Sequence, residues 1–440
     1  MAIEENNEKD ITNNESAETA SYDDYNDKLM VKKVVRKIDI YILRWAICSM
    51  CQAAVTSALT LGITRFFLGV AEAGFSPAVI DYICLFYSRK EMTMRYGIFM
   101  ALSIISGAFS GLIAYGIVLI KGLKIKSFQL IFILEGIPTI ILAIIVALFF
   151  TKGPADARFL TPKERLFVVE RLRPDGGVDE ENHTVIKSQA KSAFFDIRVY
   201  GYVFAAVVGS IPNSALSYFL PTLVSQLGFD TVQTQLMSVP PYLVATVVML
   251  SFSWYADKYQ SRALPILISD IISIIGATGM LTTSATDPSL YKLRYFFVTL
   301  ISCGVYSAQP IIYSWITSNI LGQYKRNITI AVGFTLANVG SVVGILLFQK
   351  TMAPAYTQGM ILALSMMAVQ FVIVVIMKFH LEHENRRRDL LILSNNNIQL
   401  SESELKDNKL IREKAMKIVE YEPKFDEVLC DNHPNWRYYP

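Results

Sequence analysis

The chain has 440 residues, of which 52% are hydrophobic and only 18% are charged. That composition is too apolar for an ordinary water-soluble domain, and a formal net charge of +3 does not indicate binding to nucleic acid. Long apolar runs recur between short polar gaps, as in helices that each cross a hydrocarbon layer of roughly 30 Å. The sequence therefore predicts an all-α, polytopic helical bundle in a lipid bilayer.

The first 37 residues are predicted to form a disordered tail, because residues 1–27 are acidic and polar and contain no signal peptide. Arg44 interrupts the next apolar stretch, IDIYILRWAICSMCQAAV, and is expected to lie near the membrane surface. After the tail we expect about ten membrane helices, at residues 45–60, 61–87, 96–120, 128–150, 199–225, 236–256, 264–285, 294–321, 328–350 and 357–379.

Lys and Arg gather in alternate gaps between these helices, which orients the bundle. The gaps SRKEMTMR, DKYQSR and GQYKRN and residues 151–198 all fall on one side, which the positive-inside rule assigns to the cytoplasm. Both ends of the chain are therefore predicted to be cytoplasmic.

Residues 151–198 divide the predicted helices into a first group of four and a second group of six. Inside this linker, LTPKERLFVVERLRPD has Thr161 as a helix N-cap, Pro162 at the first helical position and Glu164 three residues after the cap. We predict five regions: a cytoplasmic tail (1–37), an incomplete N-terminal membrane bundle (38–150), a cytoplasmic linker with an amphipathic helix (151–198), a C-terminal six-helix bundle (199–379) and a cytoplasmic tail (380–440).

Two charged residues lie in the apolar segment RFFLGVAEAGFSPAVI. Arg65 and Glu72 are seven residues apart, so they project from one helix face about 10 Å apart along the axis. Charges at that depth are costly and usually face a substrate or proton path. The alternative is an ion pair that only holds the bundle together.

Three further charged residues have open interpretations. Glu135 is followed by Gly136 and Pro138, which are expected to break the helix and free backbone groups to bond the carboxylate; a structural role is the alternative. Asp257 and Arg262 lie between two helices at the cytoplasmic edge, where a charge pair can hold the helices in one access state. For this pair the alternative is a solvated loop.

Several uncharged polar residues lie in otherwise apolar helices. They include Asn213 and Tyr218 in the fifth helix, Tyr306 and Gln309 in the eighth, and Asn338 in the ninth. Such side chains either bind a solute or form hydrogen bonds with neighbouring helices.

The sequence does not indicate an enzyme. It has no phosphate-binding loop, no HExxH pattern and no nucleophile elbow, and its four histidines lie in polar stretches. We therefore predict no catalytic residues, no metal site and no cofactor.

A series of motifs runs in order along the chain: RFFLGVAEAGFSP, FILEGIPT, ARFLTPKERLFVVERL, YADKYQSR, WITSNILGQYKR, APAYTQG, ENRRRD and NWRYYP. With these motifs the sequence resembles the fungal allantoate permease group of the anion:cation symporter family, within the major facilitator superfamily. The resemblance runs from about Val35 to Pro440 and is specific to the family, not to a substrate.

The resemblance implies proton-coupled uptake of a small organic anion by a monomer in the plasma membrane, through alternating access between two helical bundles. Members of the group carry allantoate, ureidosuccinate, vitamin carboxylates or sulfur compounds such as cysteine. Arg65 matches the residue that binds the substrate carboxylate, and Glu72 matches the one that takes up the proton. By the same resemblance Asn213, Tyr218, Tyr306, Gln309 and Asn338 would line the substrate cavity, and Asp257 with Arg262 would form a latch between helices.

One departure from the family is large. The family continues from VRKIDIYIL through two more helices before its Arg-Trp pair, whereas here Leu43 is followed directly by Arg44 and Trp45. Two helices, on the order of 60 to 80 residues with their loops, are therefore expected to be absent from the first half. This supports a second hypothesis: a transport-defective homologue from a decayed or wrongly assembled gene, or a membrane protein retained as a sensor or partner.

Overall fold

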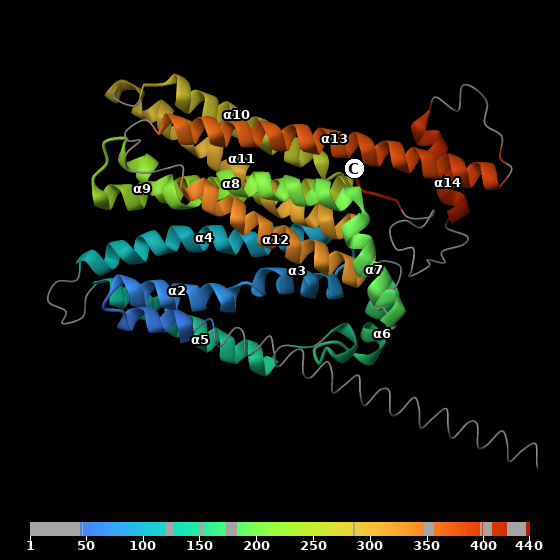
Figure 1. The fold of residues 1–440 in the computed structure, drawn as a ribbon, viewed down its shortest axis with the longest axis horizontal. Helices are drawn as coiled ribbons and strands as arrows, with labels where there is room; N and C mark the ends of the chain where they lie inside the picture. Colours follow the sequence, from blue (N-terminus) through green and yellow to red (C-terminus); the bar gives the residue numbers. More distant parts are fainter. Residues whose placement is uncertain are drawn as a thin grey trace, which may run out of the picture. The chain divides into compact units, whose positions relative to one another are not determined.

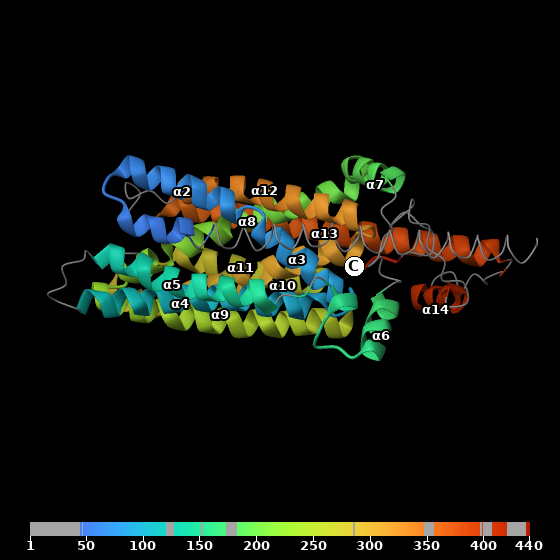
Figure 2. The ribbon, with the colours of Figure 1, turned by 90° about the horizontal axis from the view of Figure 1, so that it is seen from below.

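The computed structural model describes residues 45, 47–119, 127–149, 151, 153–172, 183–284, 287–346, 356–396, 398, 407–419 and 437–440. The chain divides into two compact units, which are described separately: unit 1 comprises Met1–Phe75 and Leu123–Arg165, and unit 2 comprises Ser76–Gly122 and Leu166–Pro440. Across the described ranges the regular elements are helical (Figures 1 and 2), and nine spans are long and apolar enough to cross a membrane. The predicted all-α polytopic bundle is confirmed.

The first predicted membrane helix, residues 45–60, is wrong. Helical residues end at Cys51, and a 3-10 turn, η1, follows at Gln52–Ala54 before the chain becomes extended. A new helix, α2 (Ala58–Glu72), begins after Ser57, whose side chain accepts a hydrogen bond from a first-turn amide in a capping box. A serine N-cap satisfies an amide that would otherwise lack a partner, so it favours a new helix start. This break is why we find nine candidate spans, not ten, in the described ranges.

The second predicted helix, residues 61–87, is interrupted. The helix α2 ends at Glu72, a turn follows at Ala73 and Gly74, and α3 covers Phe75–Phe86. Together α2 and α3 still form one apolar span. The interruption makes Glu72 the last residue of its helix.

The other long helix of unit 1 is α5 (Ser127–Phe149). Contrary to our expectation, Gly136 and Pro138 do not break it. A Cβ at residue 136 would clash with the side chain of Met50, so the glycine allows a close approach. Beside the proline, the Thr139 hydroxyl donates a hydrogen bond of 2.7 Å to the carbonyl one turn earlier. Such local hydrogen bonds allow proline inside membrane helices.

Unit 2 contains most of the other helices. They are α4 (Met92–Leu119), α7 (His183–Phe195), α8 (Ile197–Ser225), α9 (Thr231–Tyr259), α10 (Ala263–Thr282), α11 (Tyr291–Asn319), α12 (Gln323–Leu346), α13 (Thr357–Asn395) and α14 (Asn408–Val419). The predicted membrane helices from residue 96 onward are confirmed, with boundaries that differ by a few residues except at the end of α13.

The helices of unit 2 approach one another closely where small residues meet. Gly304 of α11 lies against Ser273 of α10, where an added Cβ would come within 2.8 Å of the Ser273 backbone nitrogen. On α8, the Ser210 hydroxyl donates a hydrogen bond of 2.7 Å to the Ala337 carbonyl of α12. Close backbone approach and hydrogen bonds of this kind hold helices together in a membrane.

The capped helix predicted in the linker is confirmed as α6 (Pro162–Leu172). The Thr161 amide donates to the Glu164 carboxylate at 2.8 Å, and the Glu164 amide donates to the Thr161 hydroxyl at 3.4 Å. The amide and the hydroxyl of Thr161 both donate to the Glu164 carboxylate, and they lower the pKa of Glu164 because they favour its charged form.

Helix α13 continues sixteen residues beyond the predicted end at residue 379, to Asn395. Its far part packs against α14 through Ile392 and Leu393, which form a small buried cluster with Ile411 and Ala415. The charged sequence of this region predicts a tail, but the polar residues of α13 find partners elsewhere in the chain.

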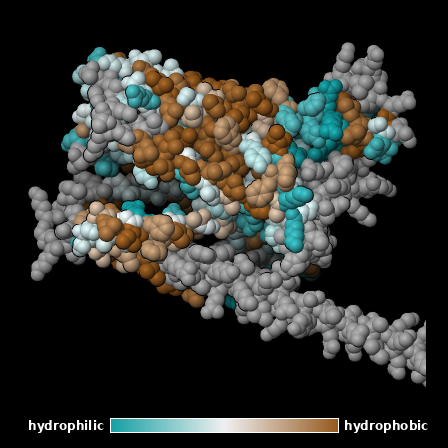
Figure 3. Space-filling model, in the orientation of Figure 1, coloured by the Kyte–Doolittle hydropathy of each residue, from teal (hydrophilic) through white to brown (hydrophobic). Residues whose placement is uncertain are grey.

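One face of unit 2 is broadly apolar (Figure 3), and its teal, hydrophilic side chains gather toward the end where α7 and the far part of α13 lie. Exposed apolar residues on α8, α12 and α13 include Phe204, Val339, Val343, Leu346, Ile361, Val372, Ile376 and Phe379. Such a continuous apolar surface is suited to contact with lipid rather than water.

We expect Gly304→Ala to lower the free energy of unfolding by about 2 kcal/mol, since the new methyl group would overpack the α10–α11 contact. The measurement is thermal or denaturant unfolding in detergent. Gly116→Ala is the control, because a Cβ there has nothing within 4 Å. Equal stability of the two variants would contradict this account of the helix contact.

Candidate functional site

The charged pair on α2 lies in unit 1, and both side chains are exposed. The guanidinium carbon of Arg65 lies 5.8 Å from the centre of the Phe132 ring on α5. Its charge attracts the Glu72 carboxylate, yet within the described ranges neither side chain has a hydrogen bond or an ion pair shorter than 4.0 Å. In the part of the chain that the structure describes, the ion pair offered as an alternative is therefore not formed.

Polar side chains from α8, α11 and α13 meet inside unit 2. The hydroxyls of Tyr306 and Ser217 lie 3.2 Å apart. A Cβ at Gly209 would lie 2.6 Å from Oε1 of Gln370 and 2.8 Å from Nε2 of Gln309. The side-chain amides of Gln309 and Gln370 therefore lie against α8 at Gly209, which has no side chain.

Some groups in this cluster lack hydrogen bonds. Nε2 of Gln309 and Nε2 of Gln370 have no partner in the described part of the chain, although Gln370 is only 2% exposed. The half-buried side chain of Asn213, on the same face of α8, also makes no hydrogen bond to any residue that the structure describes. A buried polar group left without a partner costs about 1–3 kcal/mol. The three amides are thus available to a ligand or to water.

Two of the residues predicted to line the cavity do not join this cluster. Tyr218 follows Ser217 on α8 but points outward, with 67% of its surface exposed. Asn338 of α12 is exposed as well, while its neighbour Ala337 faces α8. The structure thus brings together Asn213, Tyr306 and Gln309, and their role in binding stays a prediction.

The Asp257–Arg262 pair forms an ion pair of 3.0 Å at one end of unit 2. The same carboxylate accepts hydrogen bonds from the amides of Thr93 (3.2 Å) and Met94 (2.7 Å) at the start of α4. The Arg262 guanidinium also donates 3.0 Å to the carbonyl of Arg89, in the loop before α4. The pair therefore connects the α9–α10 loop to α4.

Arg262 is completely buried, so the solvated-loop alternative is wrong for this residue. Burial lowers the pKa of Arg262, and the Asp257 carboxylate opposes that shift. The carboxylate lies against the amides that open α4, where the helix dipole favours a negative charge. We call Asp257, Arg262 and the start of α4 the α4 latch.

Sequence reasoning missed two members of the polar cluster. Gln370 is a lone polar residue in the apolar run MMAVQFVIVV, and this isolation is a signal that could have identified it. Ser217 gave no comparable signal, because serines are frequent in these helices.

Taken together, the apolar spans, the accessible charges and the unpaired amides define a multi-pass membrane protein with polar groups suited to a small solute. Residues 36–345 match the Major Facilitator Superfamily, and the chain belongs to this superfamily. It is a family of transporters.

Similar proteins of fungi are named as transporters. The chain is 30% identical over 355 residues to the MFS transporter prlL of a fungal species, covering 80% of this chain and 71% of that protein. It is 30% identical over 372 residues to the major facilitator-type transporter hxnP of Emericella nidulans, covering 82% and 74%. It is 24% identical over 403 residues to the high-affinity nicotinic acid transporter of Saccharomyces cerevisiae, covering 90% and 70%.

Solved structures show the same fold. The proton:xylose symporter XylE matches with a TM-score of 0.57 at 14% identity, over 77% of this chain and 78% of that one. The fucose:proton symporter FucP of E. coli matches with a TM-score of 0.57 at 12% identity, over 79% and 84%. The predicted bundle of the major facilitator type is confirmed.

We expect Asp257→Asn to destabilise the protein by about 3–5 kcal/mol, because it leaves the buried Arg262 charge without its partner. The measurement is the unfolding midpoint in detergent. Glu91→Gln is the control, since the Glu91–Arg171 ion pair is exposed and contributes at most about 1 kcal/mol. Similar losses of stability in the two variants would show that the Asp257–Arg262 ion pair stabilises the protein no more than an exposed ion pair does.

Proposed function

We propose that the protein takes up a small organic anion together with protons, by alternating access. Arg65 binds the carboxylate of the substrate and Glu72 carries the coupling proton. The substrate belongs to the class of allantoate and ureidosuccinate, vitamin carboxylates or sulfur amino acids.

The observation that carries this proposal is the state of the two charges on α2. Each is exposed and without a hydrogen bond or ion pair in the described ranges, so neither is occupied by holding the fold together. The place of Glu72 at the interruption between α2 and α3 adds support, because transporters commonly build binding sites at discontinuous helices. A cation fits an anionic substrate, and a carboxylate fits a proton carrier.

The polar cluster of unit 2 supports a substrate that forms hydrogen bonds. The unpaired amides of Asn213, Gln309 and Gln370 can donate to carbonyl or carboxylate oxygens and accept from amide or ureido nitrogens. We therefore assign substrate binding to Asn213, Tyr306 and Gln309 and add Gln370. Tyr218 and Asn338 remain candidates for other parts of the path. In this proposal the α4 latch closes one side of the transport path.

The Lys/Arg-rich gaps supply the orientation. We propose that the α4 latch lies on the cytoplasmic side, that both ends of the chain are cytoplasmic, and that the protein is a monomer in the plasma membrane.

We expect Arg65→Ala to reduce uptake by about 100-fold, because it removes a charged hydrogen-bond partner of the substrate. Glu72→Gln should abolish the response to an imposed pH gradient while exchange of labelled for unlabelled substrate continues. The measurement is uptake by proteoliposomes of radiolabelled carboxylates, which also identifies the substrate. Arg171→Ala and Glu135→Gln are the controls. Proton-driven uptake that persists in both α2 variants would refute these roles.

A second candidate function is a homologue that does not transport. Apolar side chains on α2 are exposed beside its charges, among them Leu59 (75%), Phe66 (67%) and Val70 (57%). A helix with exposed apolar and charged residues is what the loss of two neighbouring helices would leave.

Uptake by the 440-residue chain should be compared with uptake by a form that has two helices inserted between Leu43 and Arg44. If the short chain is defective, the longer form alone will transport, while both forms reach the membrane in equal amounts. Equal uptake by the two forms would eliminate this candidate.

A further inference from the structure

The last four residues of the sequence, 437–440, are inserted into unit 2. We call them the terminal segment. Arg437, Tyr438 and Tyr439 are 5%, 1% and 7% exposed, and Tyr438 belongs to the largest buried apolar cluster of the unit. The chain's end, marked C in Figures 1 and 2, lies at the start of α10, where the amides of Arg262 and Ala263 donate to the Pro440 carbonyl.

Hydrogen bonds attach the backbone of this segment to α11 and α13. The carbonyl of Tyr439 accepts from the Trp315 indole at 2.6 Å and from the Asn319 amide at 3.0 Å, and its own amide donates to Asn319 at 2.6 Å. Tyr438 exchanges two hydrogen bonds of 2.9 Å with the side chain of Asn385. Two asparagines thus hold two successive residues much as a neighbouring strand would.

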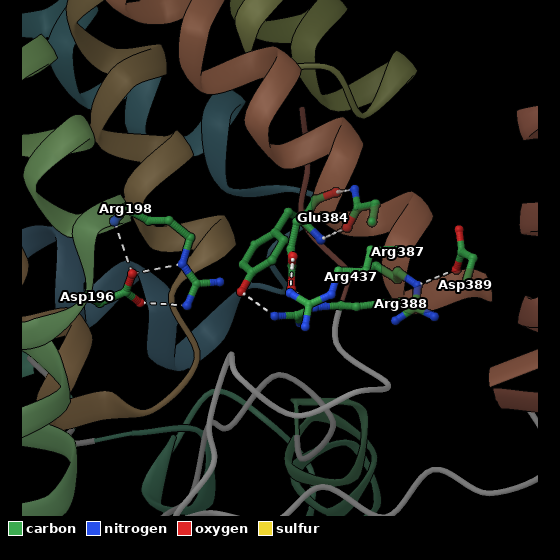
Figure 4. Close-up of polar contacts among 9 residues, drawn as sticks. Asp196, Arg198, Glu384, Arg387, Arg388, Asp389 and Arg437 are labelled. Atoms are coloured by element: carbon green, nitrogen blue, oxygen red, sulfur yellow. Dashed lines mark hydrogen bonds and ion pairs between the residues drawn. The ribbon is translucent and has the colours of Figure 1, made fainter. Parts of the chain in front are cut away.

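Charged side chains add a second set of attachments, shown in Figure 4. Arg437 donates to the Asp389 carboxylate at 2.6 Å, and both side chains are buried. Arg388 donates to the Tyr438 hydroxyl at 2.9 Å. The guanidinium carbon of Arg198, on α8, lies 4.8 Å from the centre of the Tyr438 ring. All of these partners lie on α8 and α13, the first and last membrane helices of the second group.

The segment also reaches the loop between α3 and α4, which belongs to the first group. There, Arg89 donates 3.0 Å to the carbonyl of Arg437, and its guanidinium carbon lies 4.7 Å from the centre of the Tyr439 ring. The carbonyl of Arg89 in turn accepts from Arg262 and Ser318 of the second group. Arg89 therefore joins the terminal segment to the first group.

We propose that the terminal segment is a reversible closure of the transport path on the side of the α4 latch. It stays attached to the second group, and the contacts of Arg89 with it break when the two groups separate at this end. This inference rests on the proposed transport cycle, because only a protein that opens on this side needs such a closure.

The asymmetry of the contacts supports this assignment. The segment has hydrogen bonds to the second-group side chains of Trp315, Asn319, Asn385, Arg388 and Asp389 and to the amides of Arg262 and Ala263. From the first group, Arg89 donates one hydrogen bond to it. Release of the segment from Arg89 breaks one hydrogen bond and one cation–π contact, in addition to the contacts of the α4 latch, which must open in either case. Extraction of the segment from the second group would instead expose a buried charge and unpaired amides. Separation at Arg89 is therefore the easier motion.

The test measures opening directly and needs no substrate. Cys84 of α3 is 8% exposed and belongs to the same buried cluster as Tyr438, so it serves as reporter once Cys48, Cys51, Cys303 and Cys430 are replaced by alanine. A membrane-impermeant thiol reagent is applied from the latch side in inside-out vesicles. We expect Arg89→Ala and Tyr439→Ala each to raise the labelling rate about tenfold, as loss of about one contact predicts.

Matched controls separate closure from general damage. Tyr439→Phe keeps the ring over which Arg89 lies and should label at the parental rate. Arg171→Ala removes an exposed arginine and Tyr259→Ala an exposed tyrosine, and neither should change labelling. Unfolding midpoints close to the parent's would show that the fast-labelling variants are folded.

A cross-link gives the opposite perturbation. Cysteines at positions 89 and 439, joined by a reducible linker, should hold Cys84 unreactive and block uptake, and reductant should restore both. Labelling that is unchanged in Arg89→Ala and in Tyr439→Ala, or uptake that continues at full rate in the cross-linked protein, would overturn the closure. Absent uptake with the expected labelling changes would instead count against the proposed function alone.

Discussion

The neutralisation of one buried cation organises an end of unit 2. Arg262 has no exposed surface, so its guanidinium must find partners inside the protein. It finds the Asp257 carboxylate and the carbonyls of Ala256 and Arg89, and its backbone amide donates 2.9 Å to the carbonyl of Pro440. The α9–α10 loop, the loop before α4 and the terminal segment therefore meet at one residue, and a change in any of them reaches the others.

The polar groups of the two units differ in how far the fold itself uses them. In unit 2 the Ser210 hydroxyl is bonded across helices, and the Tyr306 hydroxyl lies 3.2 Å from that of Ser217. The amides of Gln309 and Gln370 stand apart, because their nitrogens have no partner in the described ranges. On α2, the side chains of Arg65 and Glu72 likewise have no hydrogen bond or ion pair in the described ranges, although Arg65 lies over the Phe132 ring. These are the residues to which the proposed function assigns contact with a solute.

Hydropathy was sufficient to predict most membrane helices, because each apolar run must be helical in lipid whatever its neighbours are. It failed at residues 45–60, where a local serine cap overrides a continuous apolar run. The ion pair of Asp257 with Arg262 was accessible from sequence, since the two are close along the chain. The partners of Asp257 at the start of α4 were not, because no local pattern pairs a carboxylate with amides more than 160 residues away.

The long sequence separation between partners also explains why the contacts of the terminal segment could not be predicted from the sequence. The charged run around Asn385, Arg388 and Asp389 predicts a solvated tail, yet its partners lie about fifty residues further on. Buried polar and ionic contacts contribute little net stability compared with apolar packing, but they fix one geometry and fail sharply when misaligned. An apolar segment would bind the bundle more permanently and at several registers. A segment held by amides and charges binds in one register, and two contacts join it to Arg89, a hydrogen bond and a cation–π contact.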